Sequence, residues 1–122
     1  MCLIIKKSSV ALIATEDIIC YKVLTYIITV GKWLTYFKYS PVTIGDTYHS
    51  ELTRQELTIT DAIEKGLHSF ASLEDANNFV SDRLNVGVFK CVIPKGSTYY
   101  KGSFFNWKSY ASDTLVYIEI IK

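Results

Sequence analysis

The segment from Gly66 to Ser72 holds the side chains best suited to bind an anion. It reads Gly-Leu-His-Ser-Phe-Ala-Ser, so His68, Ser69 and Ser72 come where a predicted strand meets a predicted helix. The first turn of a helix leaves backbone N–H groups without partners, and its dipole favours negative charge. The pattern predicts an anion-binding junction. The alternative is that Ser72 only caps the helix and His68 is a satisfied residue at a strand end.

A second group of candidate ligand-binding side chains surrounds the turn Pro94-Lys95-Gly96-Ser97. Lys95 and Lys101 each lie beside a glycine and could bind phosphate, although lysines at turns are often only solvated. Tyr99 and Tyr100 could stack on a base, because every base presents a π-face. Neighbours on a strand point to opposite faces, so one tyrosine is predicted to face the core and the other the rim.

We therefore expect any ligand pocket to lie where the junction over 66–72 meets the corner over 94–102. Tyr110 is a further aromatic near this corner. An early strand adds Tyr21 or Lys22, whichever faces inward. The predicted ligand-binding residues are Tyr21, Lys22, His68, Ser69, Ser72, Lys95, Tyr99, Tyr100, Lys101 and Tyr110.

The sequence lacks the motifs of common catalytic and metal sites. It contains no phosphate-binding loop, no HExxH, no GxSxG and no GxGxxG pattern. His49 and His68 are the only histidines, and no acidic or thiolate residue accompanies them at a suitable spacing. No carboxylate pair is evident among Asp61, Glu64, Glu74 and Glu119. We predict no catalytic residue, no metal and no cofactor.

The elements that must position these residues are mostly strands. Runs rich in β-branched and aromatic residues alternate with turn residues along the chain. Strands are predicted over 3–5, 10–13, 18–28, 33–39, 47–52, 67–70, 88–93, 98–102 and 114–121. The strands over 18–28 and 33–39 are expected to form a hairpin, and the one over 47–52 to lie at an edge. Residues 61–65 are interpreted as one helical turn.

One helix is predicted, from Ser72 to about Leu84. Ser72 can cap it, and Asp75 resembles the acidic arm of a capping box. Its apolar residues recur at helical spacing: Leu73, Ala76, Phe79, Val80 and Leu84. We predict an α+β fold with a mainly antiparallel, curled sheet, a partly closed β-barrel or sandwich. The helix at about 72–84 packs on this sheet, and residues 1–122 form a single domain.

Charge and cysteine usage narrow the classes of partner. The 122 residues include 13 basic and 12 acidic ones. Nearly balanced charge argues against a nucleic-acid partner bound by counterion release and against a polybasic membrane-surface protein. Charged residues interrupt the apolar stretch over 9–30, which argues against a transmembrane helix. Cys20 and Cys91 are expected to be buried and reduced, as in a cytoplasmic protein.

Low net charge with many apolar residues also predicts self-association. A protein with such a surface has low colloidal solubility, and assembly into a defined oligomer would bury part of the apolar surface. The simplest arrangement is a homo-oligomer with one two-fold axis.

Several motifs resemble a small protein family of bacteriophages and gut bacteria. The most specific is the block Cys-x-Ile-Pro-Lys-Gly-Ser over 91–97, which Tyr99-Tyr100-x-Gly102 and Tyr110-Ala111-Ser112 follow. Gly66-Leu67-His68-Ser69-Phe70, Asp17 to Leu24, and Ile44 to Tyr48 belong to the same pattern. The resemblance covers most of the chain and implies a phage-type origin, with the host cell cytoplasm as its location.

A weaker similarity is to the core of ADP-ribosyltransferases. A strand with Tyr-Lys, then Gly-Leu-x-x-Phe-Ala-Ser before an Ala-Asn-x-Phe helix, is similar to their nicotinamide-nucleotide pocket. The chain departs from that pattern at His68-Ser69-Phe70. Glu119 is the one late-strand candidate for the catalytic glutamate.

These observations lead to three hypotheses of different classes. The first is a non-catalytic phage-type binding protein that sequesters a small nucleotide-like immune signal, an ADP-ribose or cyclic nucleotide, and so blunts host antiviral defence. The second is an ADP-ribosyltransferase-like enzyme. The third is an inhibitor that binds a host protein through exposed aromatic residues. The first hypothesis predicts that the ligand is recovered intact, the second that the ligand or a protein is chemically altered, and the third that neither is seen.

Overall fold

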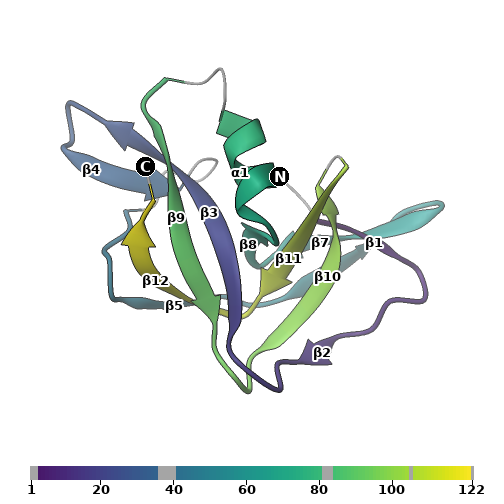
Figure 1. The fold of residues 1–122 in the computed structure, drawn as a ribbon. Helices are drawn as coiled ribbons and strands as arrows, with labels where there is room; N and C mark the ends of the chain where they lie inside the picture. The colour runs from purple at the N-terminus through teal and green to yellow at the C-terminus, as the bar shows by residue number, and fades with distance from the viewer. Residues whose placement is uncertain (1–2, 36–40, 81–83, 105, 122) are drawn as a thin grey trace.

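The computed structural model describes residues 3–35, 41–80, 84–104 and 106–121. Within them, strands dominate, and one helix, α1 (Leu73–Val80), packs against the sheet (Figure 1). The strands are β1 (Leu3–Lys6), β2 (Leu12–Ile13), β3 (Ile18–Ile27), β4 (Lys32–Thr35), β5 (Thr47–His49), β6 (Thr53–Glu56), β7 (Thr60–Lys65), β8 (Leu67–Phe70), β9 (Val86–Ile93), β10 (Thr98–Phe104), β11 (Trp107–Ser112) and β12 (Thr114–Ile120). The predicted α+β class is confirmed.

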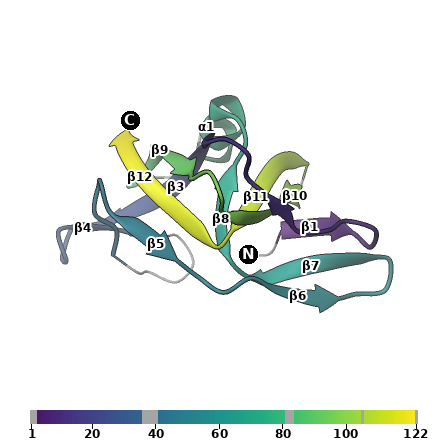
Figure 2. The same ribbon diagram turned by 90° about the horizontal axis from the view of Figure 1, so that it is seen from below.

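The strands form one curled sheet rather than two stacked ones. Their order is β5-β12-β9-β3-β8-β11-β10-β1-β7-β6, with β2 added to β10 and β4 added to β3. The strand pairings recorded in this sheet are antiparallel. β5 and β6 lie at opposite ends of the order, so the sheet is a half-barrel whose curl is visible in Figure 2. The predicted hairpin of β3 with β4 and the edge position of β5 are confirmed.

Each face of the central strands packs against its own apolar cluster. On one face, Val23 and Val88 contact the α1 residues Ala76 and Phe79. On the opposite face, Leu24, Phe89, Cys91, Leu115 and Tyr117 form a second buried cluster. This explains why β9 is a nearly continuous apolar run, since it is covered on both faces. A third cluster of Leu3, Ile5, Ile63 and Ala111 joins β1, β7 and β11.

The predicted turn over 94–97 is a corner between strands that are not neighbours in the sheet. Gly96 has a φ of 91°, a left-handed conformation that glycine adopts without steric cost, and the Ser97 N–H donates to the Pro94 carbonyl at 3.0 Å. β9 pairs with β3 and β12, whereas β10 pairs with β11, β1 and β2. The corner therefore carries the chain from the centre of the sheet to its other half.

One prediction about helical structure is wrong. Residues 61–65, interpreted as a helical turn, belong to strand β7, because β1 and β6 pair with them on both sides. The Asp61 carboxylate accepts hydrogen bonds from Lys7 at 2.8 Å and Arg54 at 2.6 Å, which fixes this strand between its neighbours.

The predicted helix is present, and its described part, α1, spans Leu73–Val80. Leu84, predicted on its apolar face, is instead 89% exposed. Residues 81–83 and the predicted strand positions 36–39 lie outside the described residues. The start of the helix agrees with the prediction, since the Asp75 N–H donates to the Ser72 hydroxyl at 3.1 Å. Among the described residues, α1 is too short to cross a membrane.

Candidate functional site

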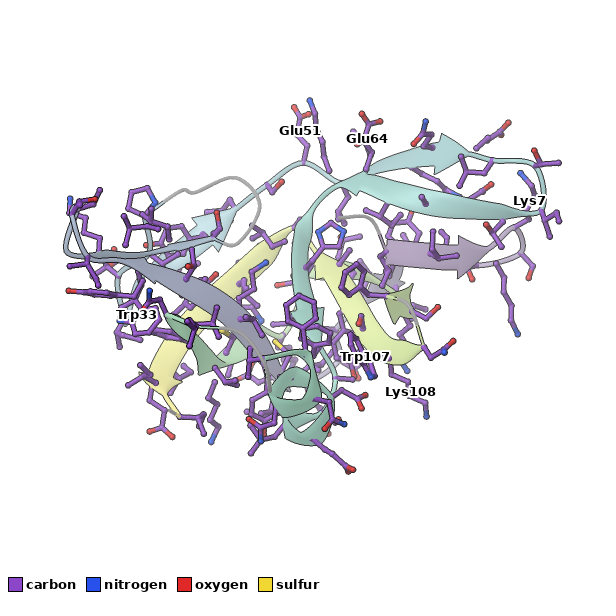
Figure 3. The ribbon with its side chains drawn as sticks, turned by 90° about the horizontal axis from the view of Figure 1, so that it is seen from above. Lys7, Trp33, Glu51, Glu64, Trp107 and Lys108 are labelled. Carbon is purple, nitrogen blue, oxygen red and sulfur yellow. The ribbon has the colours of Figure 1, made fainter. Side chains whose placement is uncertain are left out.

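The two edges of β3 differ sharply in how they are paired. One edge pairs with β9 at eight positions, from Ile18 opposite Ile93 to Thr25 opposite Val86. The other edge meets β8 at one position, Tyr21 opposite Phe70, and then pairs with β4 from Leu24 onward. Beyond Tyr21, β3 and β8 therefore diverge. Figure 3 shows both strands meeting beside α1 and separating away from it.

A cavity of about 330 Å³ lies in this opening. Its apolar walls include five aromatic side chains, Tyr48, Phe70, Phe79, Phe104 and Tyr117. Its polar lining includes Lys22, Thr35, His49, Ser50, Glu64, His68, Ser69 and Ser109. Sites for small ligands typically have volumes of roughly 300–1,000 Å³ and mostly apolar walls with a few polar groups. The cavity thus has the size and lining of a small-ligand site.

Lys22 spans the divergence between the two strands. Its Nζ donates a hydrogen bond of 2.6 Å to the carbonyl oxygen of His68, a residue 46 positions later. Alternation along β3 places Lys22 on the same face as Cys20 and Leu24, while Tyr21 and Val23 face α1. The inward-facing residue of the pair Tyr21 and Lys22 at this cavity is therefore the lysine, and its ammonium is held at the cavity wall.

His68 is buried and neutral. The residue is 8% exposed, and its ring nitrogen Nδ1 lies 3.1 Å from the Gly66 carbonyl oxygen. Burial, and next the charge of Lys22, lower the pKa of His68 to about 4, while nearby backbone carbonyls oppose this shift only in part. Because a carbonyl accepts, Nδ1 carries the proton and Nε2 is left as an acceptor. Nε2 is buried and has no hydrogen-bond partner among the described residues.

Ser69 lies on the opposite side of β8, next to the buried cysteines. It is 4% exposed, and its hydroxyl interacts with the thiol of Cys20. Burial raises the pKa of Cys20 to about 11, an increase that Ser69 moderates, and burial also raises the pKa of Cys91. Both cysteines are fully buried free thiols, as predicted. High thiol pKa values make them poor nucleophiles.

Of the ten predicted ligand-binding residues, the cavity brings together Lys22, His68 and Ser69. Tyr21 packs with the cluster under α1, and Ser72 caps that helix. The junction over 66–72 therefore contributes to the cavity through its strand rather than through its helix.

The corner residues lie elsewhere. Tyr99 is 8% exposed and packs edge-on against Tyr110 at a centroid distance of 5.9 Å. Tyr100 faces the other way, where it is partly buried against the third cluster and lies 5.9 Å from the Arg54 guanidinium, so the two tyrosines point to opposite faces as predicted. Lys95 is exposed, and Lys101 borders a shallow groove between β1 and β10. These side chains do not line the cavity between β3 and β8.

Sequence reasoning missed the aromatic wall of the cavity. Tyr48 and Tyr117, whose ring centroids are 5.4 Å apart, come from β5 and β12. Phe70, Phe79 and Phe104 form a mutual cluster with centroid distances of 5.5–6.2 Å. Each of them reads as an ordinary core position in the sequence, because the pairing that gathers them is long-range.

Two of the acidic residues singled out in the sequence, Glu64 and Glu119, lie apart in the described structure. Glu119 is exposed on β12 opposite Lys90 and does not line the cavity. Glu64 does line it, from the side away from α1 (Figure 3). Within the described ranges, no three His, Cys, Asp or Glu side chains gather as metal ligands would.

Comparison of the chain with protein-family models, with curated proteins and with solved structures found no match.

Proposed function

We propose that this protein is a non-catalytic binding protein whose cavity between β3 and β8 holds a small nucleotide-like ligand. The proposed site of action is the host cytoplasm, in keeping with the resemblance of several sequence motifs to a family of bacteriophages and gut bacteria. Sequestering an ADP-ribose or cyclic-nucleotide immune signal there would blunt antiviral defence. The observation that carries the proposal is the aromatic-walled cavity of about 330 Å³ with Lys22 at its wall.

The lining suits a ligand that combines a flat ring with an anionic group. Aromatic side chains offer stacking or edge contacts to a base, with roughly 1–3 kcal/mol for each stacked base. Lys22 can supply a charge-assisted hydrogen bond to a phosphate oxygen from a position that His68 already fixes. The buried His68 Nε2, which has no hydrogen-bond partner among the described residues, adds an acceptor near the same opening. Native proteins seldom leave a buried polar group without a hydrogen-bond partner.

The arrangement of the polar groups favours binding over catalysis. His68 and Ser69 are neighbours on β8 and point to opposite faces, so they do not form a nucleophile and base pair. Glu119, the candidate for a transferase glutamate, is exposed on β12 and away from the cavity lining. Among its described lining residues, the cavity thus has recognition groups but no pair of groups placed for general acid–base or nucleophilic chemistry.

The inhibitor hypothesis rests on exposed aromatic residues, and the described surface offers aliphatic ones instead. Its exposed large apolar side chains are valines, leucines and isoleucines, among them Ile118, Ile120 and Ile121 on or just beyond β12. Assembly into a homo-oligomer stays a prediction, which light scattering at high protein concentration would check.

The test is to recover the ligand and then locate its site with two matched lysine variants. The protein is expressed in a host with active phage defence, and small molecules released on denaturation are identified by mass spectrometry. We expect an intact nucleotide-like molecule. Its affinity, measured by calorimetry, should fall roughly ten- to a hundredfold in Lys22→Met and stay unchanged in Lys95→Met.

Melting temperature shows that each variant folds. Loss of affinity in Lys95→Met but not in Lys22→Met would place the ligand at the corner over 94–97 and overturn the cavity assignment. A chemically altered ligand would favour the transferase. Release of no nucleotide-like molecule, together with no binding of added nucleotides, would contradict the proposed function.

A further inference from the structure

We propose that β6 is the contact strand of a two-fold homodimer, in which the β6 strands of two copies pair antiparallel about Gln55. This interface is independent of the proposed ligand and goes beyond it. Low net charge with many apolar residues already predicts self-association, and β6 offers a surface that can carry it. Its basis is an open ladder edge, the phase of the backbone groups along that edge, and the placement of charges beside it.

β6 ends the strand order of the sheet on one side. Among the described strands, β7 is its one neighbour, and Figure 2 shows β6 at the outer margin of the β6–β7 hairpin. Gln55 and Glu56 are exposed on it. The strand at the other end of the order, β5, is shorter and lines the cavity through Tyr48 and His49. β6 is therefore the end of the sheet that a second chain can extend without covering the cavity.

The backbone groups of β6 alternate between its two sides. The Leu57 N–H donates to the Thr60 carbonyl at 3.1 Å, so this pair is hydrogen-bonded across the β6–β7 hairpin. In an antiparallel ladder such pairs recur at every second residue, so the backbone groups of Gln55 also face β7. The N–H and C=O groups of Arg54 and Glu56 then point to the open edge. An added antiparallel strand therefore bonds to these two residues.

This phase restricts a two-fold pairing within 54–56 to registers centred on Arg54, Gln55 or Glu56. Centring on Arg54 or on Glu56 would place that residue opposite its own copy, and like charges directly opposite each other destabilise a sheet. Centring on Gln55 places Arg54 of each copy opposite Glu56 of the other. The two residues of each hydrogen-bonded pair then also carry opposite charges, which stabilises the pairing.

The charges near β6 are unevenly distributed within one copy. Lys7 and Arg54 share the carboxylate of Asp61, at 2.8 and 2.6 Å, so this cluster has a net positive charge. Glu56 lies opposite Asp61 in the ladder and has no ion pair among the described residues. Pairing about Gln55 brings each Glu56 beside the positive cluster of the other copy. The edge is thus complementary to itself in this register.

Sedimentation velocity over a series of protein concentrations tests the dimer and its contact strand. We expect the wild type to sediment with twice the monomer mass. Glu56→Pro removes an N–H that faces the open edge, and Glu56→Lys places like charges opposite each other, so each should weaken dimerisation roughly tenfold or more. Glu74→Lys makes the same charge change at an exposed position on α1 and should leave the dimer intact. Melting temperature shows that each variant folds.

A cysteine at the proposed two-fold axis tests the register. Residues opposite each other in a non-hydrogen-bonded pair have Cα atoms roughly 4.5 Å apart, which a disulfide can span. With oxidised glutathione as the oxidant, Gln55→Cys should form a disulfide-linked dimer, whereas Thr58→Cys, in the exposed connection to β7, should not. A monomeric wild type at high concentration, a dimer that both Glu56 variants leave unchanged, or crosslinking of Thr58→Cys in preference to Gln55→Cys would overturn this inference.

Discussion

The two edges of β3 show how one strand can serve stability on one side and a binding site on the other. Toward β9, eight successive residues pair in register, and side chains such as Leu24 are fully buried. Toward β8, the ladder stops after Tyr21, and a lysine side chain reaches across instead. The first edge satisfies its backbone groups within the sheet. The second leaves room for a cavity.

The difference has an energetic meaning. Polar groups buried without partners are unfavourable, and in native proteins they concentrate where function requires them. In the described part of the chain, the buried His68 Nε2 on β8 beside the cavity has no hydrogen-bond partner. On the β9 edge, by contrast, buried apolar residues such as Cys20, Leu24, Phe89 and Cys91 pack together. Changes at the two edges should therefore affect the protein in different ways.

The largest effect is expected on the β9 edge. Leu24→Ala removes a fully buried side chain from the cluster that includes Phe89 and Leu115. Loss of burial and the resulting cavity should reduce the free energy of unfolding by about 2–5 kcal/mol. Urea denaturation measures this change.

A matched control on the same strand is Ile19→Ala, since Ile19 is 43% exposed. It should cost less than about 1 kcal/mol. Equal losses in the two variants would contradict the view that this edge is a packed core.

The next effect concerns His68 and pH. Its pKa is about 4 when folded and about 6.5 when unfolded, so the unfolded state binds the proton more readily. The contribution of His68 to the free energy of unfolding is therefore constant above pH 6.5, and the free energy of unfolding falls as the pH drops from 6.5 toward 4. The difference corresponds to about 3 kcal/mol over this range. Denaturation curves at a series of pH values measure it.

The variant His68→Gln should lose most of this pH dependence, whereas the exposed His49→Gln should retain it. Lys7 and Arg54 hold the pKa of Asp61 below its usual value, so the stability that Asp61 supplies is lost at pH values below this range. An unchanged slope in His68→Gln would show that His68 titrates normally and is not buried as described.

The smallest effect on stability is expected at the hydrogen bond from Lys22 Nζ to the His68 carbonyl oxygen, which bridges β3 and β8. Lys22→Met removes a charged hydrogen bond to His68 but also removes a partly buried ammonium, and these contributions oppose each other. The free energy of unfolding should change by no more than about 1 kcal/mol. The pKa of His68 should rise, because the Lys22 charge contributes to lowering it, and NMR titration of the imidazole can measure this. A stability loss above about 2 kcal/mol would show that the bridge holds β3 and β8 together.

Local sequence signals determined most of the elements. β-branched and aromatic runs mark the strands, Ser72 marks the start of α1, and the Pro-x-Gly pattern marks the corner with Gly96 at positive φ. Alternation also showed that Tyr99 and Tyr100 differ in burial, and residue type showed that Cys20 and Cys91 are buried. These features depend on a residue and its near neighbours, which is why the sequence alone contains them.

The tertiary structure decided which strands are neighbours, and with that the position of the cavity. Residues 61–65 became a strand because β1 and β6 pair with them, against their local pattern. Lys22 and His68 meet across 46 residues, while the corner lysines and tyrosines lie away from them. The cavity exists because the ladder between β3 and β8 stops after one pair, and where a ladder stops depends on the curl of the whole sheet rather than on any local run of residues.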